Sequence, residues 1–141
     1  MTAKEYLHQA YRLDHKINSD IEELQRLREM SYSLSSPQLG DRVQTTRSNE
    51  ASFVKCVCKI RDMEEKINAE IDLFVDLKKE IRSVIEKVEN TDEQMVLRYR
   101  YIHNMTWLEI GDELHADKST IRRWHGQALA HVVLPENPIR I

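Results

Sequence analysis

The chain has 141 residues and a formal net charge of −3, which allows one ordinary domain or two small ones. With only three glycines, three prolines and 32% charged residues, it is expected to form long exposed helices with a narrow apolar stripe. No run reaches the roughly 18 apolar residues that span a membrane. Residues 1–16 also lack a signal-peptide pattern, so we expect a cytoplasmic protein with no membrane partner.

Residues 2–30 are predicted to form one helix, because apolar side chains recur there with a mean step of 3.5 residues. These side chains are Tyr6, Ala10, Leu13, Ile17, Ile21, Leu24 and Leu27. Thr2 is the expected N-cap, and Glu5 completes a capping box. Residues 31–48 are rich in serine and threonine and contain Pro37 and Gly40, so they are predicted to form a loop.

Residues 49–89 carry the longest apolar stripe, again with a mean step of 3.5 residues. The first helix is expected to fold back over the first half of this stripe. The second half then needs another partner, either a second copy of the chain or the C-terminal region folding back. We assign the second half to an interface between two copies, formed by Phe74, Leu77, Ile81, Ile85 and Val88. Cys56 and Cys58 are expected to be packing residues, not a disulfide or metal site.

Asn90 and Thr91 interrupt the long helix, with Thr91 and Gln94 as a predicted capping box. The sequence therefore predicts an all-α fold in two modules: a coiled-coil-like helical hairpin over 1–90, with its loop at 31–48, and a three-helix domain over 91–141. In the second module, helices are expected over 92–103, from Thr106 onward, and after a turn at His115 and Ala116. Asp117 can cap the last of them. Thr106 and Glu109 are a further predicted capping box.

Residues 106–133 have the pattern of a helix-turn-helix, with Ile110, Leu114, Ala116, Ile121 and Trp124 at inward positions. The outward side chains of its second helix are then predicted to contact double-stranded DNA: Lys118, Ser119, Thr120, Arg122, Arg123 and Gln127. Arginine can bond guanine in the major groove, and Ser119, Thr120 and the helix N-terminus suit phosphate oxygens. Two positions are unusual. His115 occupies a turn position that often holds glycine. Gly126 lies inside the second helix, where glycine lowers helix stability, and it is expected to permit close packing or close approach to a backbone.

The charge of the C-terminal module limits what one copy can do. Residues 91–141 contain six basic and seven acidic side chains, a net charge of −1. Because phosphate contacts supply most non-specific DNA affinity, binding would depend on local placement of charge and on pairing two copies. The histidines are scattered, and the sequence has no phosphate loop, catalytic triad context or zinc signature. No enzyme activity, cofactor, metal or small-molecule substrate is therefore expected.

A resemblance to known families adds to this reading. Residues 97–129, LRYRYIHNMTWLEIGDELHADKSTIRRWHGQAL, resemble the last region of bacterial sigma factors, which reads the promoter −35 element. The whole chain is similar to small proteins of phages and prophages of Gram-positive bacteria, and its tail to ArpU- and RinA-type late-gene transcription regulators. The resemblance implies a bacterial host cell and DNA contacts by Lys118, Ser119, Arg122 and Arg123. Nothing upstream resembles the sigma region that grips core polymerase.

Two hypotheses follow from the sequence. The first is a phage-encoded transcriptional regulator that is dimeric through its long helices and binds DNA through the helix-turn-helix. The second is a protein-interaction module that docks on host RNA polymerase, or another host protein, without reading DNA. The net acidity of the chain favours the second.

Overall fold

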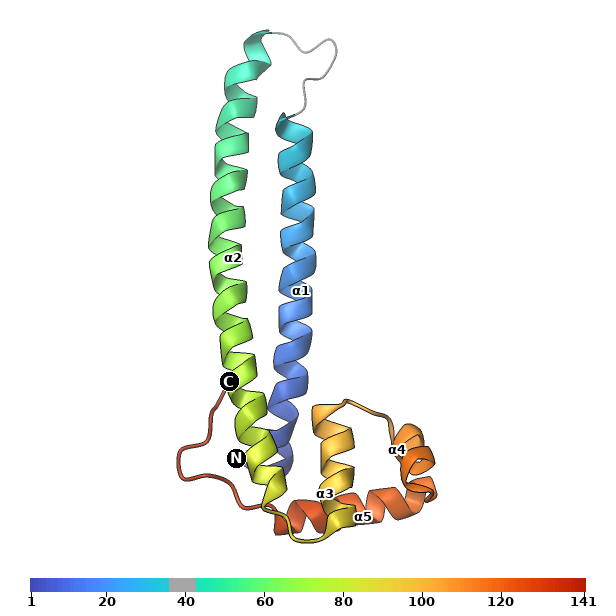
Figure 1. The fold of residues 1–141 in the computed structure, drawn as a ribbon. Coiled ribbons are helices and arrows are strands. Elements are labelled where there is room, and N and C mark those ends of the chain that lie inside the picture. Colours follow the sequence, from blue (N-terminus) through green and yellow to red (C-terminus); the bar gives the residue numbers. More distant parts are fainter. Residues whose placement is uncertain (36–42) are drawn as a thin grey trace. The chain divides into compact units, whose positions relative to one another are not determined.

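The computed structural model describes the backbone of residues 1–35 and 43–141, and the side chains of residues 1–34 and 50–141. Its elements, shown in Figure 1, are α1 (Ala3–Ser35), α2 (Val43–Glu86), α3 (Thr91–Leu97), the π-helix η1 (Arg98–Ile102), α4 (Trp107–Leu114) and α5 (Lys118–His131). The described ranges contain no strand, so the predicted all-α class is confirmed. No helix in those ranges has the length and hydropathy needed to cross a bilayer.

The described residues divide into two units. The hairpin unit comprises residues 15–72, and the helix-turn-helix unit comprises residues 1–14 and 73–141. This division differs from the predicted boundary near residue 90. The reason is that the first turns of α1 and the last turns of α2 pack with the C-terminal elements and share their core.

The hairpin unit is an antiparallel pair of helices (Figure 1). The Sγ of Cys56 donates to the carbonyl of Leu27 over 3.2 Å, and Arg28 pairs with Glu64 at 2.8 Å. Its buried apolar residues are Ile17, Leu24, Cys56 and Ile67. Three of these lie on the predicted stripes, but Cys56 does not, and the stripe residues Ile21, Val57 and Ile71 are exposed. The expectation that α1 folds back over the first half of α2 is therefore confirmed, although Cys58 is exposed and is not a packing residue.

The predicted loop over 31–48 is too long. Helix α1 continues to Ser35 and α2 begins at Val43, while residues 36–42 lie outside the described residues. The loss of apolar periodicity does not end α1, because serine and tyrosine are tolerated inside a helix.

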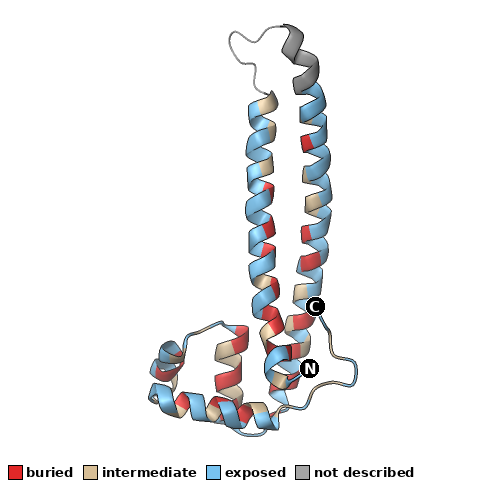
Figure 2. Ribbon diagram, turned by 180° about the vertical axis from the view of Figure 1, so that it is seen from behind, coloured by how far each residue is buried: buried red, intermediate tan, exposed pale blue. Residues whose placement is uncertain are grey.

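Buried residues lie on every helix of the helix-turn-helix unit (Figure 2). Helix α1 contributes Tyr6, Leu7, Ala10 and Leu13, all at most 2% exposed. The rest of the core comes from the end of α2 and from the C-terminal elements: Leu77, Ile81, Val84, Ile85, Val88, Val96, Leu97, Tyr101, Ile102, Ile110, Ile121 and Ala128. The apolar side chains at the start of the chain thus belong to the same unit as the C-terminal elements.

The second half of the α2 stripe is covered by the chain itself. Leu77, Ile81 and Ile85 are 0%, 1% and 0% exposed, Val88 is 5% exposed, and Phe74 is half-buried. Its assignment to an interface between two copies is wrong, because this surface is already used within one chain. The alternative, that C-terminal elements fold back on it, is correct in part: Lys78 contacts Ile102, but the first turns of α1 also reach this half of α2, where Tyr6 bonds Glu80. A periodic stripe shows that a helix face is covered, but it does not show which chain covers it.

Polar contacts hold the C-terminal elements on the end of α2. Lys78 Nζ donates to the carbonyl of Ile102 over 3.2 Å, and Gln94 Nε2 donates to the carbonyl of Glu86 over 3.2 Å. The segment after α5 also returns to this core. The backbone N–H of Ile139 donates to Glu80 Oε1 (3.1 Å), which also accepts from the hydroxyl of Tyr6 (2.6 Å).

The helix caps follow the sequence in part. Thr2 and Glu5 form the predicted reciprocal capping box, with bonds of 2.8 and 3.2 Å. At the start of α3, however, the N-cap is Asn90 and not Thr91, because the Asn90 side chain accepts from the N–H of Glu93 over 3.2 Å. Both residue types cap helices well, so local sequence did not decide between neighbours.

Candidate functional site: the helix-turn-helix

The helix-turn-helix is formed by α4, a short turn and α5. Thr106 caps α4, and its hydroxyl accepts from the N–H of Glu109 over 3.2 Å. Asp117 caps α5 by accepting from the N–H of Thr120 over 3.1 Å. Hydrogen bonds from the side chain and the backbone of Thr120, and one from the hydroxyl of Ser119, lower the pKa of Asp117. Both predicted caps are therefore present, and they set where each helix begins.

The turn depends on a left-handed residue and a close approach. His115 has φ 53° and ψ 46°, the left-handed conformation that its position predicted. The N–H of Ala116 donates to the carbonyl of Gly111 over 2.9 Å, which draws the turn against α4. A Cβ at Gly111 would lie 2.6 Å from the carbonyl oxygen of Ala116. The glycine needed for this turn is therefore Gly111, inside α4, and not the turn residue itself.

The inward face of the motif is packed as predicted. Val96 of α3, Ile110 of α4 and Ile121 of α5 are each 0% exposed and form one cluster. Half-buried side chains surround it: Tyr99, Met105, Trp107, Leu114, Ala116 and Trp124. This cluster fixes α4 and α5 against α3. Gly126 takes no part in it, since a Cβ there would meet nothing within 4 Å, so the suggestion that it permits close packing is wrong.

The outward face of α5 carries the residues predicted to contact DNA. Lys118, Ser119, Arg122, Arg123 and Gln127 are exposed, and Thr120 is half-buried. The opposite face of α5 buries Ile121, His125 and Ala128. Within the described part of the chain, neither Arg122 nor Arg123 forms an ion pair with a carboxylate. Both guanidinium groups therefore remain available to an external ligand.

Behind α4 and α5, a stack of four side chains joins η1 to the motif. The guanidinium carbon of Arg100 lies 4.2 Å from the centroid of the Trp107 ring, and Arg100 also donates to the carbonyl of Met105 over 3.0 Å. His125 meets the edge of Trp107 at 4.7 Å between centroids, and its Nε2 lies 2.7 Å from the hydroxyl of Tyr101. The stack therefore connects η1 to α4 through Trp107 and to α5 through His125.

The π-helical turn makes this stack possible. Its backbone bond runs from the N–H of His103 to the carbonyl of Arg98 over 3.1 Å, and its wider turn buries both Tyr101 and Ile102. Burial raises the pKa of Tyr101 to about 12. Burial, together with the charges of Arg100 and Lys4, lowers the pKa of His125 to about 4, so its imidazole is neutral at pH 7. These positioning residues were not predicted, because the local sequence RYRYI does not specify a π-helix.

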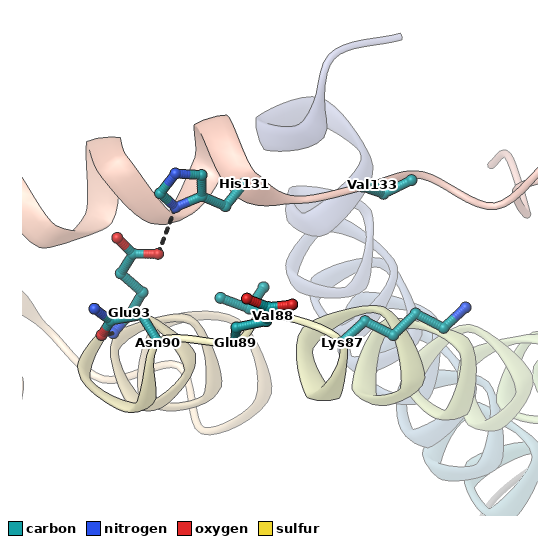
Figure 3. Close-up of a pocket in the computed structure, with 7 residues that line it drawn as sticks. All are labelled: Lys87, Val88, Glu89, Asn90, Glu93, His131 and Val133. Carbon is teal, nitrogen blue, oxygen red and sulfur yellow. Dashed lines mark hydrogen bonds and ion pairs between the residues drawn. The ribbon is translucent and has the colours of Figure 1, made fainter.

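A second histidine fastens the end of α5. Figure 3 shows His131 Nδ1 directed at Glu93 Oε2, at 2.7 Å, beside an open pocket of 410 Å³. The carboxylate of Glu93 is only 6% exposed, while the imidazole of His131 is 63% exposed. The pair closes α5 onto the first turn of α3. In the ranges with described side chains, no group of three or more His, Cys, Asp or Glu side chains is placed to hold a metal ion.

The outward face of α4 differs in charge from that of α5. It exposes the acidic residues Glu109, Asp112 and Glu113. It also exposes Leu108, which is 66% accessible to solvent. The motif therefore has a basic helix and an acidic helix with one exposed apolar group. This contrast bears on both functional hypotheses.

Comparison with known proteins identifies a family. The model of a family described as protein of unknown function (DUF1492) matches residues 33–132, and the chain belongs to that family. The matched range includes all of η1, α4 and α5. Comparison with curated proteins and with solved structures gave no match.

Proposed function

We propose that this DUF1492 member is a DNA-binding transcriptional regulator, of the kind that phages and prophages encode, and that α5 is its recognition helix. The observation that supports the proposal most is the division of α5 into two faces. Ile121, His125 and Ala128 anchor one face, and the other presents Arg122 and Arg123 without a carboxylate partner in the described structure. A fixed helix with an unpaired basic face suits the major groove.

In this proposal the exposed residues of α5 have separate roles. Arg122 and Arg123 bond base edges or nearby phosphates, and Gln127 lies one further turn along the same helix. Lys118, Ser119 and Thr120 are at the helix N-terminus, where backbone N–H groups attract phosphate oxygens. The capping carboxylate of Asp117 opposes an approaching phosphate there. The side chains of Arg122 and Arg123 are accordingly proposed to dominate binding.

The test is a double substitution, Arg122→Ala with Arg123→Ala, in the full chain. Loss of two arginine contacts should weaken binding to a selected duplex by at least tenfold, since one good contact contributes about 1–3 kcal/mol. Both residues are exposed, so helix content should not change. Lys79→Ala with Arg82→Ala removes the same charge from exposed positions of α2 and serves as the control. Equal affinity of the two double variants across a salt titration would contradict the proposal.

We propose two copies of the chain on one DNA site, joined through the hairpin unit. A single copy offers DNA only three cations on α5, Lys118, Arg122 and Arg123, so its affinity for DNA should be weak. Linking two weak sites raises the overall affinity. The hairpin unit exposes apolar side chains that a second copy could cover. On α2 these are Val54 (59% exposed), Val57 (43%) and Ile71 (39%), and on α1 Ile21 (44%). These residues replace the stripe from Phe74 to Val88 as the proposed interface.

One observation favours the alternative of a protein-interaction module. Leu108 and the carboxylates of Glu109, Asp112 and Glu113 form an acidic face with an exposed apolar group, which fits a basic protein surface better than DNA. Host RNA polymerase is the candidate partner that the sigma-like sequence suggests. Binding of purified bacterial RNA polymerase that is lost in Leu108→Ala, with no DNA binding at low salt, would support this alternative over the first.

A further inference from the structure

Basic side chains converge at the start of α1. Lys4, His8 and Arg12 are spaced four residues apart, so they share one face of the helix. Two neighbouring cavities meet at His8. One, of 220 Å³, is lined by Lys4, Glu5, His8 and Arg12. The other, of 270 Å³, is lined by His8, Tyr11, Arg100, Tyr101, Asn104 and Thr106. We call these two cavities together the α1 cleft.

Arg100 brings a fixed guanidinium group to this cleft. Its position is set by the Trp107 ring, 4.2 Å away, and by the hydrogen bond it donates to the carbonyl of Met105. A guanidinium group has five N–H donors, and this bond uses one nitrogen, Nη1. The remaining donors can serve a ligand in the cavity that Arg100 lines. Because the side chain is already held, binding would cost little side-chain entropy.

One carboxylate, Glu5, lies beside the cations of the cleft, and its pKa is lowered by hydrogen bonds to Thr2 and, less strongly, by the charge of Arg12. In the part of the chain with described side chains, none of Lys4, Arg12 and Arg100 forms an ion pair with a carboxylate. The acidic group that lines the cleft, Glu5, accepts from the backbone N–H of Thr2 over 2.8 Å in the capping box of α1. Burial, followed by the charges of Arg12, Arg100 and Lys4, lowers the pKa of His8.

We propose that the α1 cleft binds a phosphate group through Lys4, His8, Arg12 and Arg100. A phosphate offers several acceptor oxygens and matches an arginine fork with neighbouring point charges. The amide of Asn104 and the hydroxyl of Thr106 line the same cavity and can donate to further oxygens. The phosphate comes either from the backbone of DNA bound at α4 and α5 or from a free phosphate ligand. The DNA source rests on the proposed function, whereas the free source does not.

The test removes the two exposed cations and leaves the stacked one in place. Lys4→Gln with Arg12→Gln deletes two charges from exposed positions of α1, so the fold should be retained. Lys79→Gln with Arg82→Gln deletes the same charge from exposed positions outside the cleft and is the control. Each full-length protein is titrated against a labelled mixed-sequence duplex at several NaCl concentrations. The midpoint of thermal unfolding is also measured in sodium phosphate and in sodium chloride of equal ionic strength.

Two outcomes support the proposal and assign the source. If DNA supplies the phosphate, the slope of log affinity against log salt becomes shallower by about 0.9 for each backbone phosphate lost, in the cleft variant and not in the control. If a free ligand supplies it, phosphate raises the unfolding midpoint of the wild-type protein and the control but not of the cleft variant. This second result stands even if the protein binds no DNA, in which case the proposed function fails and the cleft remains a phosphate site.

One outcome overturns the proposal and leaves the proposed function intact. It is a wild-type protein that binds DNA, a cleft variant with the same salt slope as the control, and no effect of phosphate on the unfolding midpoint of any variant. A protein with neither DNA binding nor a phosphate response would overturn both.

Discussion

Two glycines of the helix-turn-helix have opposite surroundings. A Cβ at Gly111 would lie 2.6 Å from the backbone oxygen of Ala116, whereas a Cβ at Gly126 would meet nothing within 4 Å. Gly111→Ala should therefore lower the free energy of unfolding by about 1–3 kcal/mol, because the turn must shift. Gly126→Ala should raise it by up to about 1 kcal/mol, because alanine is the better helix former. Urea unfolding followed by tryptophan fluorescence measures both, and a Gly111→Ala protein as stable as wild type would contradict the role given to the turn.

His125 should make the helix-turn-helix unit sensitive to acid. Its pKa is about 4 in the folded chain, against about 6.5 for an exposed histidine. Between these values the unfolded chain binds more protons than the folded one, so acid favours unfolding. Falling pH should lower the free energy of unfolding progressively from about pH 6.5 to pH 4, by at most about 3 kcal/mol, with no further contribution from His125 below that.

The measurement is urea unfolding between pH 7.5 and pH 4, followed by the fluorescence of Trp107 and Trp124. Both tryptophans lie in the helix-turn-helix unit, so the signal reports on that unit. His125→Gln removes the titrating group and should flatten the pH dependence in this window. An equally steep acid loss in His125→Gln would show that other groups cause it.

At the level of single residues, the sequence predicted what depends on a local pattern. The caps at Thr106 and Asp117, the left-handed His115 and the inward cluster at Ile110 and Ile121 all follow from residue type and spacing. The stack of Arg100, Trp107 and His125 did not follow, because it joins residues from three elements through a π-helix that the local sequence does not specify. The proposed α1 cleft was missed for the same reason: Lys4 and Arg12 are distant in sequence from Arg100.

At the level of elements, the hairpin unit contains a buried pair of acidic residues. Asp20 on α1 and Glu70 on α2 are 8% and 9% exposed, and both carboxylate oxygens of Glu70 lack a hydrogen-bond partner. Lys66 Nζ lies 3.5 Å from Asp20 and 3.9 Å from Glu70. Burial, and interaction with Asp20, raise the pKa of Glu70, while Lys16 and Lys66 act against the shift. The pair therefore weakens the hairpin whenever both groups are ionised.

Glu70→Gln should stabilise the hairpin unit at pH 7 by about 1 kcal/mol, because it removes a buried charge that lacks hydrogen bonds.

The raised pKa of Glu70 also determines how the stability of the hairpin unit depends on pH. The folded unit holds its proton more tightly than the unfolded chain, so Glu70 stabilises the unit below pH 4.5 and this contribution is lost as pH rises through the folded pKa. Hydrogen exchange of amides within residues 15–72 measures the effect. Glu65→Gln, at an exposed site, should change nothing, and faster exchange in Glu70→Gln would contradict the argument.

For the elements, the sequence predicted the helices well and their partners poorly. Apolar periodicity placed α1, α2, α4 and α5, but it gave Leu77, Ile81 and Ile85 to a second copy when their own chain covers them. The segment that ends in Ile139 was not predicted to return to Glu80. Such contacts depend on which apolar surfaces are still uncovered when the elements pack in three dimensions. The periodicity of the sequence does not contain that information.

For the whole molecule, the proposed pairing of two copies places the interface on the hairpin unit. Val54→Glu with Val57→Glu would bury charges in that interface, so the double variant should be monomeric at concentrations where wild type is dimeric. It should also lose affinity for a selected duplex while each chain stays folded. Analytical ultracentrifugation gives the mass. Val133→Glu, at a residue that is 74% exposed and outside the hairpin unit, is the control, and a wild-type chain that sediments as a monomer would contradict the proposed dimer.

The proposal that α5 reads DNA is tested most directly by selecting bound duplexes from a random pool with the full chain at low salt. We expect enrichment of a short sequence, present twice if two copies bind, and no enrichment by the Arg122→Ala, Arg123→Ala variant. A folded wild-type protein that enriches no sequence, or a double variant that enriches the same one, would contradict it.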